Sequence, residues 1–392
     1  MSNILLVAAA FPPDQGVGTL RISSLAAYMS KKDNIFLVTN RKKGELPAYI
    51  KRASFVDICT ESGSFKNNLN TFRVNQKKYQ SAVEGMIKEC HPDIVIISGG
   101  PFFTFACTKT AKKHGVPSIL DFRDPWIFDI REGWYSRSTM VERIVHLLDE
   151  RTAVANATRV TTVTDGWVKL FKKFYPLQRS KFVKIENGYD DAIVESIKLD
   201  NPHTKMEDTL VITGFGKMFY YSDKYSLIFL QGLKKYLDAG KKANLLQVGS
   251  RESQADSLLN KANVAQDVLQ TTGFVDYKVG VQKIAESDVC LIIDSRNHAL
   301  GTKLYDYIFI NRPILFVGPK NSDLSKMVLQ FKNGFACTTG EEVFNALQTL
   351  KKNDFLSEKP SREQFKRERQ NKLWRDLIYG LIKNEKTGCH FL

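Results

Sequence analysis

The sequence lacks the patterns that mark secreted and membrane-spanning proteins. Its six cysteines lie far apart within 392 residues and have no paired short spacing, which is typical of buried free thiols in a reducing compartment. No apolar run approaches the ~18 residues that a membrane-spanning helix needs. The apolar run at residues 4–10 has no basic leader and is followed by Pro12 and Pro13, so it predicts a strand and not a signal peptide. We expect a cytoplasmic protein that is at most peripheral to a membrane.

Several catalytic and nucleic-acid patterns are missing as well. The chain has no Walker loop and no Gly-x-Ser-x-Gly motif, which argues against P-loop nucleotidases and serine hydrolases. It has no Asp-x-Asp motif to hold a divalent ion against a diphosphate, and its six histidines have no metal-ligand spacing. Zinc-finger, RNA-recognition and basic-zipper patterns are also absent. We expect neither a bound metal nor a nucleic-acid partner.

Acidic residues are too few to balance the basic ones. The formal net charge is +15, which predicts attraction to anions such as nucleic acid, an anionic membrane surface or phosphorylated small molecules. The excess is +9 in residues 1–198 and +6 in the remainder. Because a nucleic-acid module usually concentrates its charge, this even spread favours the other two kinds of partner.

Short apolar runs alternate with longer segments of helical spacing, which is typical of parallel strands joined by crossover helices. The alternation stops at a polar stretch, residues 198–209, and then starts again, so we expect two doubly wound α/β domains facing a cleft. The domains are residues 1–197 and 210–360, joined by that linker and followed by a C-terminal helix and tail, residues 361–392, that cross back over the junction. The expected strands are residues 4–10, 35–39, 94–98, 118–122, 160–163, 210–213, 244–248, 268–271, 289–293 and 314–317, with helices at 21–30 and 104–114.

The segment from Gly301 to Leu315 is the most informative part of the chain. It follows the apolar run at residues 289–293 and predicts a loop, a short helix and a second buried strand. In open α/β sheets, a loop of this kind that opens into a helix N-terminus holds phosphorylated ligands. Asp306 would lie one turn into the helix, placed to accept hydrogen bonds from a ribose diol. The alternative is an ordinary helix with one solvent-exposed carboxylate.

Several segments together resemble the group-1 glycosyltransferases of the GT-B fold, also called glycosyltransferase family 4. These are residues 11–21, with two prolines, two glycines and a basic residue, residues 121–126, which read Asp-Phe-Arg-Asp-Pro-Trp, and residues 186–190, 213–217 and 301–315. The resemblance covers nearly the whole chain. It implies retaining, metal-independent transfer of a sugar from a nucleoside diphosphate, UDP or GDP, to a saccharide or lipid-linked saccharide of the cell surface.

In the first domain, the resemblance implies a loop that binds an anion or a hydroxyl group and a loop that binds the acceptor. Gly16 and Gly18 would let backbone amides approach the ligand, with Arg21 on the first turn of the next helix. A plain structural turn is the alternative. Asp121, Arg123 and Asp124 would lie on the acceptor side, and Arg123 stands where many members have a histidine. Arg123 and Asp124 could instead simply pair with each other.

In the second domain, the resemblance implies a donor site. Gly216 and Lys217 match the loop whose basic residues meet the donor diphosphate, and Lys224 is an alternative to Lys217. A cation there offsets the charge of the leaving phosphate without a metal. Arg251 and Phe274 mark strand ends similar to those that line the pocket for a uracil or guanine base.

The family signature in the donor segment is a pair of glutamates eight positions apart, for the transferred sugar and the ribose. His298 and Asp306 stand at these positions. Asp306 keeps a carboxylate with a shorter reach. His298 cannot accept hydrogen bonds as a carboxylate does, so sugar recognition must differ or fall to Asp294, Ser295 or Asn297; a structural role for His298 is the alternative. The helix N-terminus at Thr302 and Lys303 would complete the diphosphate site.

The helix expected at residues 166–174 bears on location. Asp165 can cap it, its aromatic and leucine side chains share one face, and the stretch from Gly166 to Lys184 has six basic residues and no acidic ones. Such a helix can lie on the anionic inner face of a cell membrane. The alternative, which we favour, is that the aromatic face packs against the domain's own sheet.

Three functions fit these observations. The first is the retaining, metal-independent glycosyltransferase, with Arg123, Asp124 and Lys217 as the residues closest to the chemistry. The second is a non-catalytic binding or scaffold protein of a polysaccharide assembly complex, suggested by the altered positions at Arg123, His298 and Asp306. The third, a nucleotide-sugar epimerase of the same fold, ranks last because such epimerases lack a helix like the one at residues 301–307.

Overall fold

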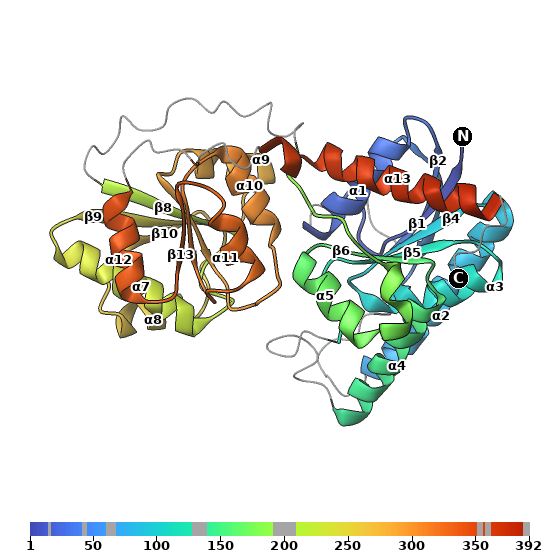
Figure 1. The fold of residues 1–392 in the computed structure, drawn as a ribbon, viewed down its shortest axis with the longest axis horizontal. Helices are drawn as coiled ribbons and strands as arrows, with labels where there is room; N and C mark the ends of the chain where they lie inside the picture. The colour runs from blue at the N-terminus through green and yellow to red at the C-terminus, as the bar shows by residue number, and fades with distance from the viewer. Residues whose placement is uncertain are drawn as a thin grey trace. The chain divides into compact units, whose positions relative to one another are not determined.

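The computed structural model of the chain describes residues 1–14, 17–40, 45–59, 68–127, 139–190, 209–350, 356 and 362–386. It divides into two compact units, Met1–Asn187 with Glu368–Leu392, and Gly188–Arg367 (Figure 1). Each unit has its own sheet and its own apolar core, and each is described here by itself. The cleft expected between the two domains stays a prediction, and so does the linker, of which residues 198–208 lie outside the described part of the chain.

The first unit is built on seven strands that all run parallel, in the order β3-β2-β1-β4-β5-β6-β7. The strands are β1 (Asn3–Val7), β2 (Asn34–Asn40), β3 (Ile50–Val56), β4 (Ile94–Ser98), β5 (Ser118–Phe122), β6 (Arg159–Thr162) and β7 (Phe182–Lys184). The helices are α1 (Val17–Met29), α2 (Asn68–Cys90), η2 (Phe102–Ala106), α3 (Cys107–Lys113), α4 (Met140–Asn156), α5 (Asp165–Phe174), η4 (Pro176–Lys181) and, from the C-terminus, α13 (Arg367–Lys386).

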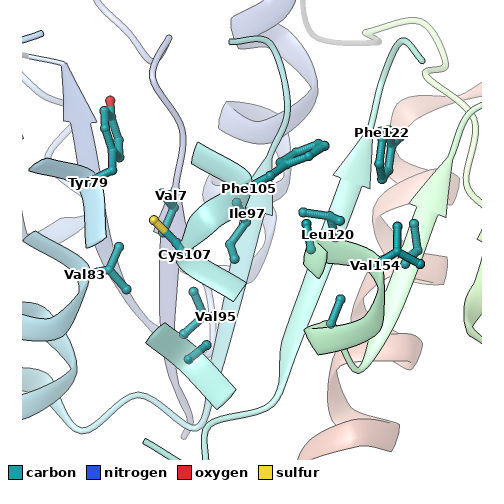
Figure 2. Close-up of a cluster of buried hydrophobic side chains, with 14 of the residues drawn as sticks. Val7, Tyr79, Val83, Val95, Ile97, Phe105, Cys107, Leu120, Phe122 and Val154 are labelled. Atoms are coloured by element: carbon teal, nitrogen blue, oxygen red, sulfur yellow. The ribbon is translucent and has the colours of Figure 1, made fainter. Parts of the chain in front are cut away.

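Successive strand residues point to opposite faces of this sheet, and both faces are covered. On one face, Val95, Ile97 and Leu120 meet Tyr79 of α2 and Phe105 of η2, all fully buried (Figure 2). This packing fixes the helices and turns that follow β4 and β5.

The other face of the first sheet is covered by helices from the two ends of the chain. Ile4 and Leu6 of β1 pack with Ile22 of α1 and with Trp374 and Ile378 of α13. The C-terminal helix is therefore part of the first unit's core, where full burial of a large apolar side chain contributes about 1.5–3 kcal/mol.

The second unit is built on six parallel strands in the order β10-β9-β8-β11-β12-β13. The strands are β8 (Thr209–Phe215), β9 (Lys242–Val248), β10 (Leu269–Thr271), β11 (Val289–Ile293), β12 (Ile314–Val317) and β13 (Gly334–Cys337). The helices are α7 (Asp223–Asp238), α8 (Ala255–Lys261), η5 (Gln266–Val268), α9 (Tyr277–Ala285), α10 (Thr302–Ile310), α11 (Asp323–Val328), α12 (Gly340–Thr349) and η6 (Arg362–Phe365).

Two apolar clusters cover the two faces of the second sheet. Leu291 and Leu315 belong to one cluster with α7 and α12, whereas Ile292 and Phe316 belong to the other with α10. Central strands buried on both faces explain the continuous apolar runs of β11 and β12.

The expected architecture of two parallel α/β sheets is confirmed, with every expected strand present and shifted at its ends by three residues at most. Strands β3, β7 and β13 were not expected from the sequence. The helix expected at 104–114 begins as the turn η2 and continues as α3. The described cysteines are free thiols, and Cys90, Cys107, Cys290 and Cys337 are buried.

The cap expected for the helix at residues 166–174 is wrong by one residue. Thr164 is the N-cap of α5, and its hydroxyl accepts from the backbone N–H of Trp167. Asp165 is instead the first residue of the helix and pairs with Lys184 at 2.8 Å. Trp167 and Phe171 are buried in the core, which bears out the packing alternative for this face.

No helix in the described part of the chain is both long enough and apolar enough to cross a membrane.

Candidate functional site

Each sheet has a topological switch point. In the first unit the chain runs from β1 to β2 and β3 and then returns to β4 on the other side of β1; in the second it runs from β8 to β9 and β10 and then returns to β11 beside β8. Open α/β sheets bind ligands at the carboxyl ends of the strands at such a point. The loops after β1 and β4, and those after β8 and β11, are therefore the candidate binding loops.

In the second unit, hydrogen bonds hold the two candidate loops together. The Ser295 hydroxyl donates to the carbonyl oxygen of Tyr221 at 3.0 Å, and the Lys303 ammonium donates to the carbonyl oxygen of Lys217 at 2.8 Å. A third hydrogen bond fixes the loop after β8, because the backbone N–H of Met218 donates to the buried carboxylate of Glu252 at 2.7 Å. The backbone of both loops is thus fixed without a ligand.

Cationic side chains gather on these loops and lie over aromatic rings. Lys217 Nζ is 4.0 Å from the centroid of the Tyr220 ring, and the guanidinium carbon of Arg296 is 4.5 Å from that of Tyr221. Lys303 Nζ lies 5.7 Å from the same Tyr221 ring. Contacts of this geometry favour the charged form of the side chain and restrict where its head can go.

The charge of this cluster is only partly balanced from within. Arg296 pairs with the buried carboxylate of Asp294 at 2.7 Å. Burial lowers the pKa of Lys303 to about 8, and the carboxylate of Asp294 opposes this shift. Lys217, Lys303 and Arg296 thus bring three cationic groups together at the carboxyl end of the sheet, where an anion would find favourable charge.

The N-terminus of α10 lies in the same place. Gly301 is its N-cap and has no side chain to accept from the first backbone N–H groups, and Thr302 is the first helical residue. Those N–H groups and the helix dipole together favour a bound anion. The predicted residues Lys217, Thr302 and Lys303 are therefore brought together by the structure.

Asp306, one turn further along α10, is buried and has a partner. Its carboxylate accepts a short hydrogen bond from the hydroxyl of Tyr277, the first residue of α9. Burial raises the pKa of Asp306 to about 6, and the Tyr277 hydroxyl and the charge of Arg367 oppose this shift. The carboxylate therefore does not point freely into solvent, and its contact with a ribose stays a prediction.

His298 and its neighbours lie on the loop that precedes α10. His298 Nδ1 is 3.3 Å from a carboxylate oxygen of Asp323, the first residue of α11. The carbonyl oxygen of Asn297 accepts from the backbone N–H of the same aspartate at 2.8 Å. Asp294 and Ser295 are already engaged by Arg296 and Tyr221. The loop is therefore tied to α11, and a role for His298 in sugar recognition stays a prediction.

The other predicted donor residues lie on surrounding loops. Gly216 has a left-handed backbone (φ 66°) with no atom near the position of a Cβ, so a ligand can approach its backbone. Lys224 lies on the first turn of α7, 5.4 Å from the centroid of the Tyr225 ring. Arg251 binds Asp256 and the carbonyl oxygen of Leu269, and Phe274 is 85% exposed.

In the first unit, Arg21 and Asp121 form a buried ion pair at 3.0 Å. Asp121 is fully buried and also accepts from the hydroxyl of Thr161 at 2.7 Å. Arg21 donates to the carbonyl oxygen of Glu186 at 2.8 Å, and its guanidinium carbon lies 5.4 Å from the centroid of the Trp374 ring. The pair joins α1, β5, β6 and α13, and its contact with an acceptor stays a prediction.

Arg123 and Asp124 lie where the chain leaves β5. The guanidinium of Arg123 folds onto the loop after β4, where it donates to the carbonyl oxygens of Gly99 and Gly100, the latter at 2.9 Å. Burial lowers the pKa of Arg123, although the nearby carboxylates of Asp121 and Asp124 oppose this shift. Asp124 is exposed. Arg123 therefore ties the end of β5 to the loop at the first unit's switch point.

Two further predicted residues concern the loop after β1. Gly18 lies in the first turn of α1, whereas Gly16 lies outside the described residues.

Three side chains of the donor region were not expected from the sequence. Tyr277 bonds Asp306, and Tyr221 and Arg296 stack on each other. They come from the start of α9 and from two loops, and no spacing within the sequence links them. Arg296 alone gave a signal, because it lies between the expected strand and the expected helix of the most informative segment.

Comparison with protein families gives one match, which covers most of the first unit. Residues 19–193 match the model of Glycosyltransferase Family 4. Among curated proteins, no sequence matches the chain.

Comparison with solved structures finds similar folds over nearly the whole chain. The chain is similar to sucrose-phosphate synthase from Thermosynechococcus elongatus, with 12% identity, a TM-score of 0.62, and coverage of 98% of this chain and 96% of that one. It is similar to Anabaena HepE in complex with UDP and glucose, with 12% identity, a TM-score of 0.62, and coverage of 97% and 100%. It is also similar to UDP-GlcNAc 2-epimerase from Methanocaldococcus jannaschii, with 13% identity, a TM-score of 0.59, and coverage of 96% and 99%.

Identities this low establish the fold and not the substrate. Residues 19–193 match the glycosyltransferase family 4 model, and the chain as a whole has the GT-B fold.

Proposed function

We propose that the protein transfers a sugar from a nucleoside diphosphate to a saccharide acceptor, with retention of configuration and without a metal ion. The observation that carries this proposal is the meeting of Lys217, Lys303 and the N-terminus of α10 at the switch point of the second sheet. A diphosphate carries about two negative charges near neutral pH, and two lysines with a helix N-terminus offset them without a divalent ion.

The same groups would act on the transition state. As the glycosidic bond lengthens, negative charge builds up on the phosphate that leaves. Fixed cations and backbone N–H groups stabilise that charge more than they stabilise the ground state, because they are already in place. Asp306 would accept a hydrogen bond from the ribose of the donor, and the uracil or guanine base would lie near the loop that holds Phe274.

The acceptor would bind the first unit. Arg123 is held at the switch point by carbonyl oxygens of the loop after β4, and Asp124 beside it is exposed. These groups suit hydroxyl or phosphate groups of a saccharide or a lipid-linked saccharide. A cell-surface polysaccharide assembled at the cytoplasmic face of a membrane fits such an acceptor and the net charge of +15.

The test is a donor panel. The purified protein is titrated calorimetrically with UDP-, GDP- and TDP-sugars and then assayed for hydrolysis and for transfer to saccharide acceptors. We expect diphosphate donors to bind through the cations, and any preference among the three nucleotides to identify the base that the protein recognises. Folded protein that binds none of these donors would refute the proposal.

The second candidate is a non-catalytic protein that binds nucleotide or saccharide within an assembly complex. It is motivated by His298, whose ring contacts Asp323, at the position where the family has a glutamate. The variant Asp306→Ala separates the two functions in cells that make the polysaccharide. A glycosyltransferase would lose turnover and product, whereas a scaffold would support unchanged production. Product formed without any acceptor would instead indicate an epimerase.

A further inference from the structure

The peptide group between Lys217 and Met218 is bonded at both of its polar ends. Its carbonyl oxygen accepts from the ammonium of Lys303 at 2.8 Å, and its N–H donates to a carboxylate oxygen of Glu252 at 2.7 Å. A trans peptide is planar, and its oxygen and hydrogen point to opposite sides. The ammonium and the carboxylate therefore face each other across one rigid group, within about 8 Å of each other.

Glu252 is a buried acid in the loop between β9 and α8. The residue is 8% exposed. One carboxylate oxygen accepts the bond from Met218, whereas the other, Oε2, is buried and has no hydrogen-bond partner among the residues that the structure describes. Because a buried carboxylate that is only partly satisfied is costly, a positive charge at short range stabilises it.

The loops after β8 and β9 are packed too closely for Glu252 to move away. The backbone N–H of Gly216 donates to the carbonyl oxygen of Val248 at 2.8 Å, and the side-chain amide of Gln247 donates to the carbonyl oxygen of Gly216 at 2.9 Å. A Cβ on Gly249 would lie 2.8 Å from that same carbonyl oxygen, so only glycine fits there. The position of Glu252 relative to the loop after β8 is thus fixed by the backbone.

Charged and aromatic groups from three loops act on Lys303. Burial lowers the pKa of this lysine to about 8; Asp294 and Glu252 oppose the shift, and Arg296 adds to it. The Tyr221 ring lies 5.7 Å from the ammonium. Asp294 and Arg296 are paired with each other at 2.7 Å, so their opposite effects on Lys303 largely cancel. Glu252 is then the carboxylate that decides how far the lysine stays charged.

We propose that Glu252 is a positioning residue of the donor site, which fixes the loop that carries Lys217 and keeps Lys303 positively charged. It acts through the peptide group between them and touches no substrate. One buried carboxylate thereby sets the position of the first lysine and the charge of the second. Its importance for donor binding rests on the proposed sugar transfer, whereas its effect on Lys303 needs no donor.

Two substitutions separate charge from support of the backbone. Glu252→Gln keeps an oxygen that can accept from Met218 but removes the negative charge. Glu252→Asp keeps the charge but shortens the side chain. If Glu252 only supported the loop, Lys303 would titrate alike in wild type and in Glu252→Gln. If its charge acts on Lys303, only the neutral variant should change the titration strongly.

The test is an NMR titration of full-length protein labelled with ¹³C at the lysine ε carbons, without any ligand. The signal of Lys303 is the one that Lys303→Arg lacks. We expect its midpoint near pH 8 in wild type. In Glu252→Gln it should fall by about 0.5–1.5 pH units, because a negative charge about 8 Å away no longer favours the ammonium. A second neutral variant, Glu252→Ser, should show the same fall, and Glu252→Asp should stay closer to wild type.

The matched control is Glu286→Gln, a change of an exposed glutamate at the end of α9, before β11 and therefore at the amino end of that strand. It should leave the midpoint of Lys303 within about 0.2 pH units of wild type. An unchanged midpoint in the neutral variants at Glu252 would overturn the proposal. Equal shifts in Glu252→Gln and Glu252→Asp, or in Glu252→Gln and the control, would overturn it too.

Calorimetry with UDP- and GDP-sugars reports separately on the proposed function. Near pH 6.5, where Lys303 is charged in both proteins, Glu252→Gln should bind the donor within twofold of wild type. Above about pH 7.5 it should bind several-fold more weakly, because its lysine has lost more of its charge. Wild type that binds no donor, with the NMR shift as expected, would refute sugar transfer and leave the effect of Glu252 on Lys303 established.

Discussion

Asp306 is the single side chain on which the proposed donor recognition depends most. It is buried on α10 and bonded to Tyr277, and burial raises its pKa to about 6. A carboxyl with that pKa is ionised above it and protonated below it. A protonated carboxyl is a poorer acceptor for a ribose hydroxyl, so donor affinity should be full near neutral pH and should fall as the pH drops through about 6.

The variant Asp306→Asn tests this prediction. It keeps the size of the side chain but removes the charge, and a hydrogen bond to a charged group contributes about 1.5–3 kcal/mol. Donor affinity measured by calorimetry at neutral pH should therefore fall by at least tenfold and should no longer weaken in acid. Unchanged affinity, or a loss of affinity below about pH 6 that persists in the variant, would show that another group recognises the donor.

Tyr277 should position Asp306 and tune its ionisation. Its hydroxyl opposes the raised pKa of Asp306, so Tyr277→Phe should raise that pKa further and move the acid limb of donor binding to higher pH. Affinity at neutral pH should fall several-fold, and affinity at higher pH should recover. A loss that is the same at every pH would mean that Tyr277 only supports packing.

Arg21 and Asp121 should matter more for stability than for contact with the acceptor. Their side chains are buried and bonded to each other at 3.0 Å. Removing one partner of a buried pair leaves an uncompensated charge and costs about 3–5 kcal/mol, whereas replacing both partners costs less.

Chemical denaturation of Arg21→Met, Asp121→Leu and the double variant checks this prediction. Each single variant should lose several kcal/mol of unfolding free energy, and the double variant should lose clearly less than their sum. Additive losses would mean that the two residues do not act as a pair. Separate contacts with the acceptor would then be the better explanation for each.

At the scale of single elements, α10 combines a free N-terminus with a titrating lysine. Lys303 lies in its first turn, and burial lowers the pKa of this lysine to about 8. The lysine is charged below that pH and loses its charge above it. Together with Asp306, it predicts a bell-shaped pH profile of kcat/KM for the donor, with limbs near pH 6 and pH 8.

The variant Lys303→Arg tests the basic limb. Arginine keeps its charge at every accessible pH, so the decline above about pH 8 should move out of the measured range while the acid limb stays. Lys261→Arg, an exposed change on α8, is the matched control and should keep both limbs. A basic limb that persists in Lys303→Arg would assign it to another group.

The segment containing α10 could be predicted from the sequence because it is local. The apolar run of β11, the glycine before the helix and the apolar run of β12 follow each other within one stretch of chain. Strand β3 could not be predicted in the same way, because Lys51 and Arg52 interrupt its apolar pattern and it is paired only with β2, on the edge of its sheet. Strand β7 is only three residues long.

The contacts of the donor region could be predicted only in part. Lys217 and Lys303 carried a signal because each follows a strand in a glycine-containing loop. Tyr277 carried none, because its bond to Asp306 joins α9 to α10 and depends on how the two helices pack on the sheet. Asp121 was expected to face an acceptor, and only the fold shows Arg21 lying against it.

At the scale of the whole molecule, the chain forms two separate α/β units. Each unit has its own apolar core and its own switch point, and of the net charge of +15 the first unit carries +13 and the second +2. This division could be expected from the sequence because the alternation of strands and helices restarts after the polar stretch at residues 198–209. The return of α13 to the first unit shows in Trp374 and Ile378, which pack with α1.

The central claim is that Lys217, Lys303 and the N-terminus of α10 bind the diphosphate of a nucleotide sugar. Calorimetric titration of UDP, GDP and their sugar conjugates into wild type and Lys217→Met tests it most directly. The control is Lys241→Met, a change directly before β9, at the amino end of that strand. We predict that wild type and control bind the same nucleotide equally and that Lys217→Met binds it at least tenfold more weakly. Equal binding by all three proteins, or no binding by folded wild type, would contradict the claim.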